Sequence, residues 1–269
     1  MLARRPGRGV LVVLVLAALG QAPLARADSG NVVLNLDRYD GTEAIRGWAA
    51  GAMWMGRAGD QDPFRVGLAG VWLEDGHWGY AAAGRTFHLG QRNQCDASAR
   101  WGRASLPGQS HDFTEVSATL YTSVVPGRWI VTLGDSWLDV GDREGQLVQG
   151  GLDFVARGRW SAGLRLFSGI TGDLEENYLN GNVRLRGASV TWVLGATLGR
   201  TVPFPGAAPE ATQSSSEVYL GVAIPVGRQQ MTFTASRFDG ESTRRRTLSA
   251  SWLLPLSPQR GTAPEGAPP

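Results

Sequence analysis

The feature that most constrains the fold of this chain is an alternation of apolar residues with small or polar ones. It recurs in stretches of about ten residues, the length of a membrane-crossing strand, from 44 to 254. The stretch 188–199 shows the two faces: Val190, Trp192, Leu194, Ala196 and Leu198 against Ser189, Thr191, Gly195 and Thr197. Because side chains alternate along a strand with a period of two, the pattern predicts strands with one apolar and one polar face. No helical period competes with it.

A soluble β-sandwich would show the same alternation, so the composition of the second face decides between the two folds. That face holds mostly Gly, Ser, Thr, Asn and Gln with scattered charges, and the chain contains no Lys. A wall with lipid on one side and a wet lumen on the other requires this pattern in every strand. We therefore predict an all-β fold, a transmembrane antiparallel up-and-down β-barrel over 44–254.

The two ends of the chain differ from this central part. Residues 1–27 combine an arginine-rich start with an apolar run from Val10 to Leu19 and small residues at Ala25 and Ala27, a pattern typical of a cleaved secretory signal peptide. The run is too short to cross a bilayer of about 30 Å as a helix. We expect a periplasmic N-terminal segment at 28–43, within which a further strand at 30–37 stays open, and a disordered Pro/Gly-rich tail at 255–269.

Removal of the leader changes the charge of the chain. The leader carries four of the 26 basic residues and no acid, so 22 basic and 24 acidic residues remain, a net charge of −2. Without a basic excess, binding to nucleic acid loses its main support. We therefore expect no nucleic-acid partner. Cys95 is the only cysteine and gives no disulfide framework.

Twelve strands fit the alternation, an even number as single-chain bacterial barrels have. They are 44–56, 63–73, 77–89, 111–124, 128–138, 146–157, 159–168, 178–186, 188–199, 214–224, 228–238 and 244–254. The connections after odd strands are the longer ones: 57–62, 90–110, 139–145, 169–177, 200–213 and 239–243. Those after even strands are tight: 74–76, 125–127, 158, 187 and 225–227. Long loops belong outside and short turns in the periplasm, which predicts that both termini are periplasmic.

Tryptophans near the short turns support this orientation. Trp and Tyr prefer the headgroup level of a membrane, and five Trp on the apolar face lie within a few residues of these turns: Trp72, Trp78, Trp129, Trp160 and Trp252. We interpret them as a periplasmic girdle. The alternative, an ordinary sandwich core, would not collect them at one end of successive strands.

The leader, the alternating strands, the aromatic girdle and the closing strand 247–254 together resemble bacterial outer-membrane β-barrel proteins of about twelve strands. In the closing strand, Trp252 and Leu254 stand at the alternating hydrophobic positions of the assembly signal of these proteins. Ala250 stands where Gly is common, and a tail follows instead of a terminal aromatic residue. The resemblance implies a place in the outer membrane of a Gram-negative cell, contact with its lipids and insertion by the barrel assembly machinery.

Charged residues on the polar face are the candidate site. Alternate residues of a strand point to the same face, and we call a residue's place in this alternation its parity. By parity, the residues expected to line the lumen are Glu115, Asp153, Arg157, Arg165, Arg184, Arg186 and Glu217, with Asn180 and Asn182 beside them. Inward arginines in a narrow pore would attract anionic solutes, as in the twelve-stranded porins for acidic oligosaccharides that the chain distantly resembles. Alternatively, arginines and acids pair across the lumen and plug it.

Catalysis and metal binding have little support. The three histidines, His77, His88 and His111, are scattered, and Ser110 and Asp112 beside His111 point to the opposite face of a strand. None of the histidines precedes a serine by two residues, as in the barrel lipid hydrolases of the outer membrane. We assign no catalytic residue, no metal ligand and no cofactor.

These observations predict a non-enzymatic outer-membrane barrel that forms a narrow polar or weakly anion-preferring channel. One alternative is a non-conducting subunit of an envelope-spanning machine for secretion, polysaccharide export or gliding motility. In that case loops 90–110 and 200–213 would bind other envelope proteins. A second alternative is an outer-membrane lipid hydrolase.

Overall fold

The computed structural model describes residues 29–42, 45–57, 62–106, 109–141, 143–156, 159–172, 174–201 and 213–256. The expected signal peptide at 1–27 and nearly all of the expected tail at 255–269 lie outside these residues. Within them, no helix is long and apolar enough to cross a membrane.

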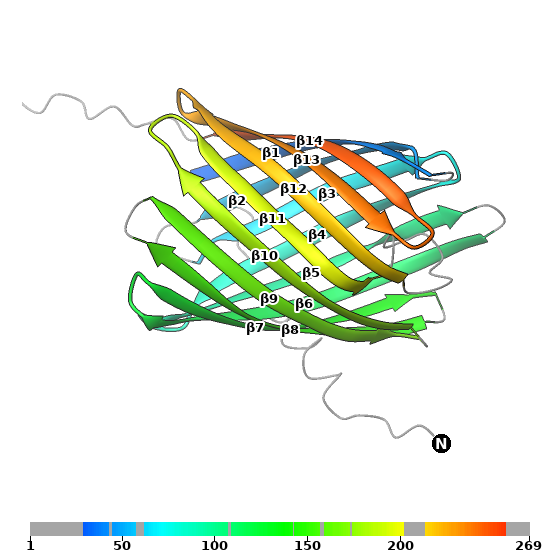
Figure 1. Cartoon of the computed structure of the whole chain (residues 1–269), viewed down its shortest axis with the longest axis horizontal. Coiled ribbons are helices and arrows are strands. Elements are labelled where there is room, and N and C mark those ends of the chain that lie inside the picture. Colours follow the sequence, from blue (N-terminus) through cyan, green and yellow to red (C-terminus); the bar gives the residue numbers. More distant parts are fainter. Residues whose placement is uncertain are drawn as a thin grey trace, which may run out of the picture.

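The described residues form fourteen antiparallel strands that close into one barrel (Figure 1), in which each strand pairs with its neighbours in sequence and β1 pairs with β14. The strands are β1 (Ser29–Gly41), β2 (Gly47–Arg57), β3 (Phe64–Leu73), β4 (Gly76–His88), β5 (Asn93–Leu106), β6 (Gln109–Val125), β7 (Trp129–Val140), β8 (Arg143–Ala156), β9 (Trp160–Thr171), β10 (Leu174–Arg186), β11 (Thr191–Thr201), β12 (Gln213–Val226), β13 (Gln229–Gly240) and β14 (Arg244–Pro255).

The prediction of twelve strands over 44–254 is therefore wrong by two. β1 lies in the segment expected to be a periplasmic extension, and β5 lies in the expected loop 90–110. The outer face of β5 holds small residues such as Ala97 and Ala99, while Asp96 and Arg100 lie on its inner face. Trp101 is the one large apolar residue on the outer face of β5, so the alternation of this strand is weak in the sequence.

β1 closes the barrel by pairing on both of its edges. Leu34 lies opposite Trp252 of β14 on one side and Ala52 of β2 on the other. Without β1, both neighbouring strands would present unpaired backbone groups, which a membrane does not tolerate. The backbone N–H of Leu256 donates to the carbonyl of Gly30 over 2.8 Å. The start of β1 and the end of β14 therefore lie at the same end of the barrel, here called the terminal rim. The other end is the opposite rim.

The two additional strands change which connections share a rim. β1 reverses the direction of the next three strands and β5 restores it, so turn 74–75 lies at the opposite rim, whereas β2 ends and β3 begins at the terminal rim. The turns near 126, 187 and 227 do lie at the terminal rim, as do the end of β8 and the start of β9. The predicted loops 139–145 and 169–177 consist mostly of strand residues, so the contrast between long and short connections is much weaker than expected.

Exposure distinguishes the outer face of the wall from the inner one. Leu68, Leu133, Leu194 and Leu248 share the outer parity and are 57–68% exposed, as a lipid-facing belt requires. Nine of the ten Trp also have the outer parity, and they form two groups. Near the terminal rim lie Trp54, Trp129, Trp160, Trp192 and Trp252, and toward the opposite rim lie Trp48, Trp72, Trp101 and Trp137.

The predicted girdle of five Trp is therefore corrected. Trp129, Trp160 and Trp252 lie near one rim as expected, but Trp72 lies near the other because turn 74–75 is at the opposite rim. Trp78 pairs with Val71 and Ala104 on the inner parity and is only 8% exposed. It points into the barrel.

The barrel interior as the candidate functional site

An apolar cluster fills part of the interior near the opposite rim. Its buried members come from β2 to β5 and from the β1–β2 connection: Ala49, Val71, Trp78, Ala104 and Ile45. Tyr39, Leu73, Tyr80 and Phe113 pack against them. Burial of Ala104 to 2% exposure on the inner wall of a barrel means that other side chains cover it. The lumen is therefore narrowed on this side.

Aromatic residues continue around the inner wall at this level. Phe167 and Tyr178 stack with ring centroids 4.5 Å apart and an interplanar angle of 13°. Phe238 is 5% exposed, and the Arg245 guanidinium lies 5.2 Å from its ring. All of these residues lie in the half of their strand nearest the opposite rim. We name the set the aromatic collar: Tyr39, Trp78, Tyr80, Phe113, Phe167, Tyr178 and Phe238.

Two ion pairs lie next to the collar. Arg100 of β5 pairs with Glu115 of β6, and its guanidinium lies 5.8 Å from the Tyr80 ring. Arg245 Nη2 lies 3.8 Å from Glu217 Oε1. Glu115 and Glu217, two of the three acids predicted to line the lumen, therefore face arginines that neutralise them.

The half of the interior nearest the terminal rim is polar. Arg65 donates to both carboxylate oxygens of Asp96 over 2.6 and 3.0 Å, and the Thr86 hydroxyl donates to the same carboxylate over 3.3 Å. Arg165 Nη2 lies 3.4 Å from Asp153 Oδ2. Since bidentate pairs such as Arg65–Asp96 are geometrically specific, they fix the polar wall in one arrangement.

Hydroxyl and amide side chains fill the wall between these ion pairs. The Asn180 amide donates to the Thr197 hydroxyl over 2.8 Å, and the Gln149 amide donates to the Thr119 hydroxyl over 3.0 Å. The Ser98 and Ser117 hydroxyls also lie 2.8 Å apart. The first and third of these bonds join neighbouring strands, and the Gln149–Thr119 bond joins β8 to β6 across β7. All three leave the inner wall hydrophilic.

The structure places six of the seven charged residues of the candidate site on the inner wall: Glu115, Asp153, Arg165, Arg184, Arg186 and Glu217. Asn180 and Asn182 lie there too. Arg157 lies outside the described residues. Sequence reasoning missed Arg65, Asp96, Arg100 and Arg245. The parity of its strand would have identified Arg65, but Asp96 and Arg100 lie in the unrecognised strand β5.

Arg184 and Arg186 differ from the other inner charges. They lie two residues apart at the end of β10, at the terminal rim, and both are exposed. Among the residues that the structure describes, neither has an ion pair within 4.0 Å. The remaining inner arginines named above each face an acid, so these two give the terminal mouth of the lumen its excess positive charge.

The histidines do not converge on one place. The ring Nδ1 of His88 lies 2.6 Å from Asp62 at the terminal rim, and the backbone N–H of His88 donates to the same oxygen over 3.1 Å. Burial raises the pKa of the Asp62 carboxyl, but the hydrogen bonds from His88 outweigh burial and hold that pKa below its usual value. His77 and His111 lie near the opposite rim, on β4 and β6. Ser110 contacts Arg103 instead of a histidine.

No family model and no curated protein matches this sequence. Among solved structures, the chain is similar to the CymD monoaromatic hydrocarbon channel, with a TM-score of 0.58, 9% identity and coverage of 94% of this chain and 93% of that one. It is also similar to the Ralstonia pickettii toluene transporter TbuX (0.56; 12%; 89% and 92%) and the Acinetobacter baumannii outer membrane protein Omp33 (0.54; 11%; 84% and 99%). The chain thus has the fold of bacterial outer-membrane β-barrels.

Proposed function

We propose that this chain is a non-enzymatic outer-membrane channel that passes small solutes and weakly prefers anions. The observation that carries the proposal is the inner wall itself. It is polar over the half nearest the terminal rim, and it ends in a mouth where Arg184 and Arg186 have no ion pair among the described residues.

Electrostatics explains why the preference would be weak. Charges that are paired along the inner wall, such as Arg65–Asp96 across β4 and Arg165–Asp153 between β9 and β8, contribute little net field inside the lumen. Fixed positive charge at a mouth raises the local concentration of anions. Screening by salt at physiological ionic strength should limit this field to about 8 Å from the mouth.

The aromatic collar would set the size limit. It narrows the lumen near the opposite rim with closely packed rings, which favours small solutes over oligomers. The solved neighbours CymD and TbuX are a hydrocarbon channel and a toluene transporter, which supports transport of small molecules as a use of this fold.

The proposal includes the placement of the barrel in the cell. With both termini in the periplasm, the terminal rim faces the periplasm and the opposite rim faces outward. The barrel assembly machinery would insert the chain after removal of residues 1–27, and outer-membrane lipids would surround the exposed leucine belt.

Ion selectivity in planar bilayers tests the proposal. Purified wild-type protein should conduct, and its reversal potential in a salt gradient should indicate anions. The double variant Arg184→Ser, Arg186→Ser should shift that potential toward cations, because the fixed charge at the mouth is removed. Arg85→Ser is the control, since Arg85 lies on the outer face of β4 near the same rim. Equal selectivity of the wild type and the double variant would refute the anion preference.

A second candidate is a non-conducting barrel that anchors an envelope-spanning machine, for example one for secretion, polysaccharide export or gliding motility. Burial of Trp78 and Ala104 inside the barrel favours it. In this case the connection within 200–213 would bind other envelope proteins. A wild-type protein that is folded but shows no conductance would support this candidate against the channel.

A further inference from the structure

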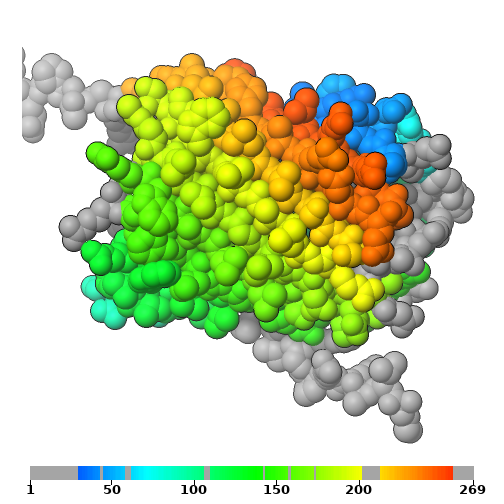
Figure 2. Space-filling view, viewed as in Figure 1, coloured from blue at the N-terminus to red at the C-terminus, as the bar shows by residue number. Residues whose placement is uncertain are grey.

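A groove of about 420 Å³ lies on the outer wall, over the strands on both sides of the barrel closure. Figure 2 shows this face of the wall, on which β10 to β14 lie side by side. The small residues Gly221, Ala235 and Ala250 form part of the groove lining. Larger apolar side chains complete it: Leu36, Trp48, Trp192, Leu220, Val222, Phe233 and Leu248.

An arginine cluster lies on the same strands, between this groove and the opposite rim. We define it as Arg38, Arg237, Arg244 and Arg246, all of which have the outer parity. Arg38 itself lines the groove, and its guanidinium lies 4.7 Å from the Trp48 ring. The apolar groove and the arginine cluster therefore adjoin each other at Arg38.

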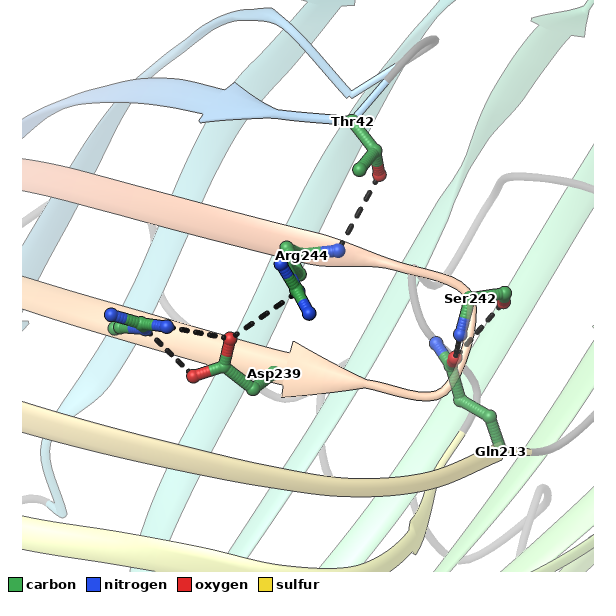
Figure 3. A network of polar contacts seen from close by, with 6 residues as sticks. Thr42, Gln213, Asp239, Ser242 and Arg244 are labelled. Atoms are coloured by element: carbon green, nitrogen blue, oxygen red, sulfur yellow. Dashed lines mark hydrogen bonds and ion pairs between the residues drawn. The ribbon is translucent and has the colours of Figure 1, made fainter.

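The cluster holds more positive than negative charge. Asp239 contacts two of its arginines, Arg237 over 2.7 and 3.1 Å and Arg244 over 3.9 Å (Figure 3). Asp40 and Glu74, which also lie at this rim, contact Arg46 instead. Among the described residues, Asp239 is thus the one carboxylate within ion-pair distance of the cluster, and Asp40 lies opposite Arg246 in the strand register but pairs with Arg46.

Two of these arginines lie directly opposite each other. Arg237 of β13 pairs with Arg246 of β14 in the strand register, on the outer face. Like charges in directly opposite positions of a sheet repel and destabilise the pairing. An anion bound between the two guanidinium groups would remove this cost, and phosphate matches the geometry of the guanidinium group.

We propose that the groove and the arginine cluster form one site for a diphosphorylated glycolipid of the lipid A type. An acyl chain occupies the groove, and the phosphates bind the arginines at the headgroup level. The cluster extends over three adjacent strands, β13, β14 and β1, or about 10 Å at the usual strand spacing, which suits two phosphates better than the single phosphate of a glycerophospholipid. The site lies on the outer wall and is independent of conduction through the lumen.

Titration of the purified full chain in an uncharged detergent tests the site, with native mass spectrometry as the measure of bound lipid A. The wild type should retain lipid A. The double variant Arg237→Gln, Arg246→Gln should bind it about tenfold more weakly or less, because charge-assisted hydrogen bonds to phosphate are lost. Ala250→Phe should weaken binding through the other half of the site, by filling the groove without changing any charge.

Arg103→Gln is the matched control. Arg103 is an exposed arginine with the outer parity near the same rim, but it lies on β5, away from the groove. This variant should bind lipid A like the wild type, and all variants should retain the heat-modifiable mobility of a folded barrel on a gel. Unchanged binding by the double variant, or equally tight binding of phosphatidylglycerol by the wild type, would overturn the proposal.

Discussion

At the scale of single residues, close contacts between neighbouring strands determine which positions accept a side chain. Gly102 of β5 lies against β4, where an added Cβ would be 2.1 Å from the carbonyl oxygen of Gly79 and 2.7 Å from the Tyr80 Cβ. The first of these atoms is backbone and cannot rotate away. Because Tyr80 belongs to the aromatic collar, the absence of a Cβ at 102 leaves room for this part of the collar beside β5.

The substitution Gly102→Ala should therefore separate β4 from β5 locally and lower the temperature at which the barrel unfolds in detergent. Gly79→Ala is the control, because the Cβ at that position would meet only the Ala69 carbonyl oxygen, at an ordinary distance of 3.7 Å. Overpacking typically costs about 1–3 kcal/mol. Circular dichroism during heating measures the effect, and an equal melting temperature for both variants would contradict it.

At the scale of the strands, the sequence predicts those whose outer face carries large apolar residues. β11 and β12, with Leu194 and Leu220 on their outer faces, lie close to their predicted ranges. β5 could not be recognised in this way, because its two faces differ little in hydrophobicity. Cys95, which the sequence placed in a loop, lies in this strand. The parity of each recognised strand is set by lipid contact, whereas pairing between strands is a long-range property that no local pattern contains.

The two faces of the wall should respond differently to a charge. Leu194 lies on the outer face near the middle of β11, with 59% exposure, and Leu194→Arg should destabilise the barrel in lipid by about 2–4 kcal/mol. Thr234→Arg introduces the same side chain on the inner face of β13, opposite Gly221, and should be tolerated better. Reversible unfolding by guanidinium in lipid vesicles gives both free energies. Equal losses would mean that the assignment of faces is wrong.

At the scale of the whole molecule, charge is organised by ion pairs between strands of the inner wall. The parity of β6 predicts that Glu115 faces inward, but its partner Arg100 comes from a strand that the sequence did not reveal. The same holds for the collar, since Trp78 is a large apolar residue that nevertheless lies on the inner face of β4, opposite Val71 and Ala104. The sequence thus predicts that a single residue such as Glu115 faces inward, but it does not predict which residue that side chain contacts.

The orientation of the whole barrel is the last property to be tested. A chain with Cys95→Ala as background takes a single new cysteine either at Glu241, in the connection between β13 and β14 at the opposite rim, or at Arg228, in the turn between β12 and β13 at the terminal rim. If the termini are periplasmic, a membrane-impermeant thiol reagent applied to intact cells should label Glu241→Cys.

Arg228→Cys should react only after the outer membrane is permeabilised, because it would lie on the periplasmic side. Native Cys95 cannot serve this purpose, since it lies within β5 opposite Phe87 and Leu120. The reverse labelling pattern would place the opposite rim in the periplasm. It would then put the arginine cluster at the inner leaflet, where a phosphorylated glycolipid of the outer leaflet could not reach it.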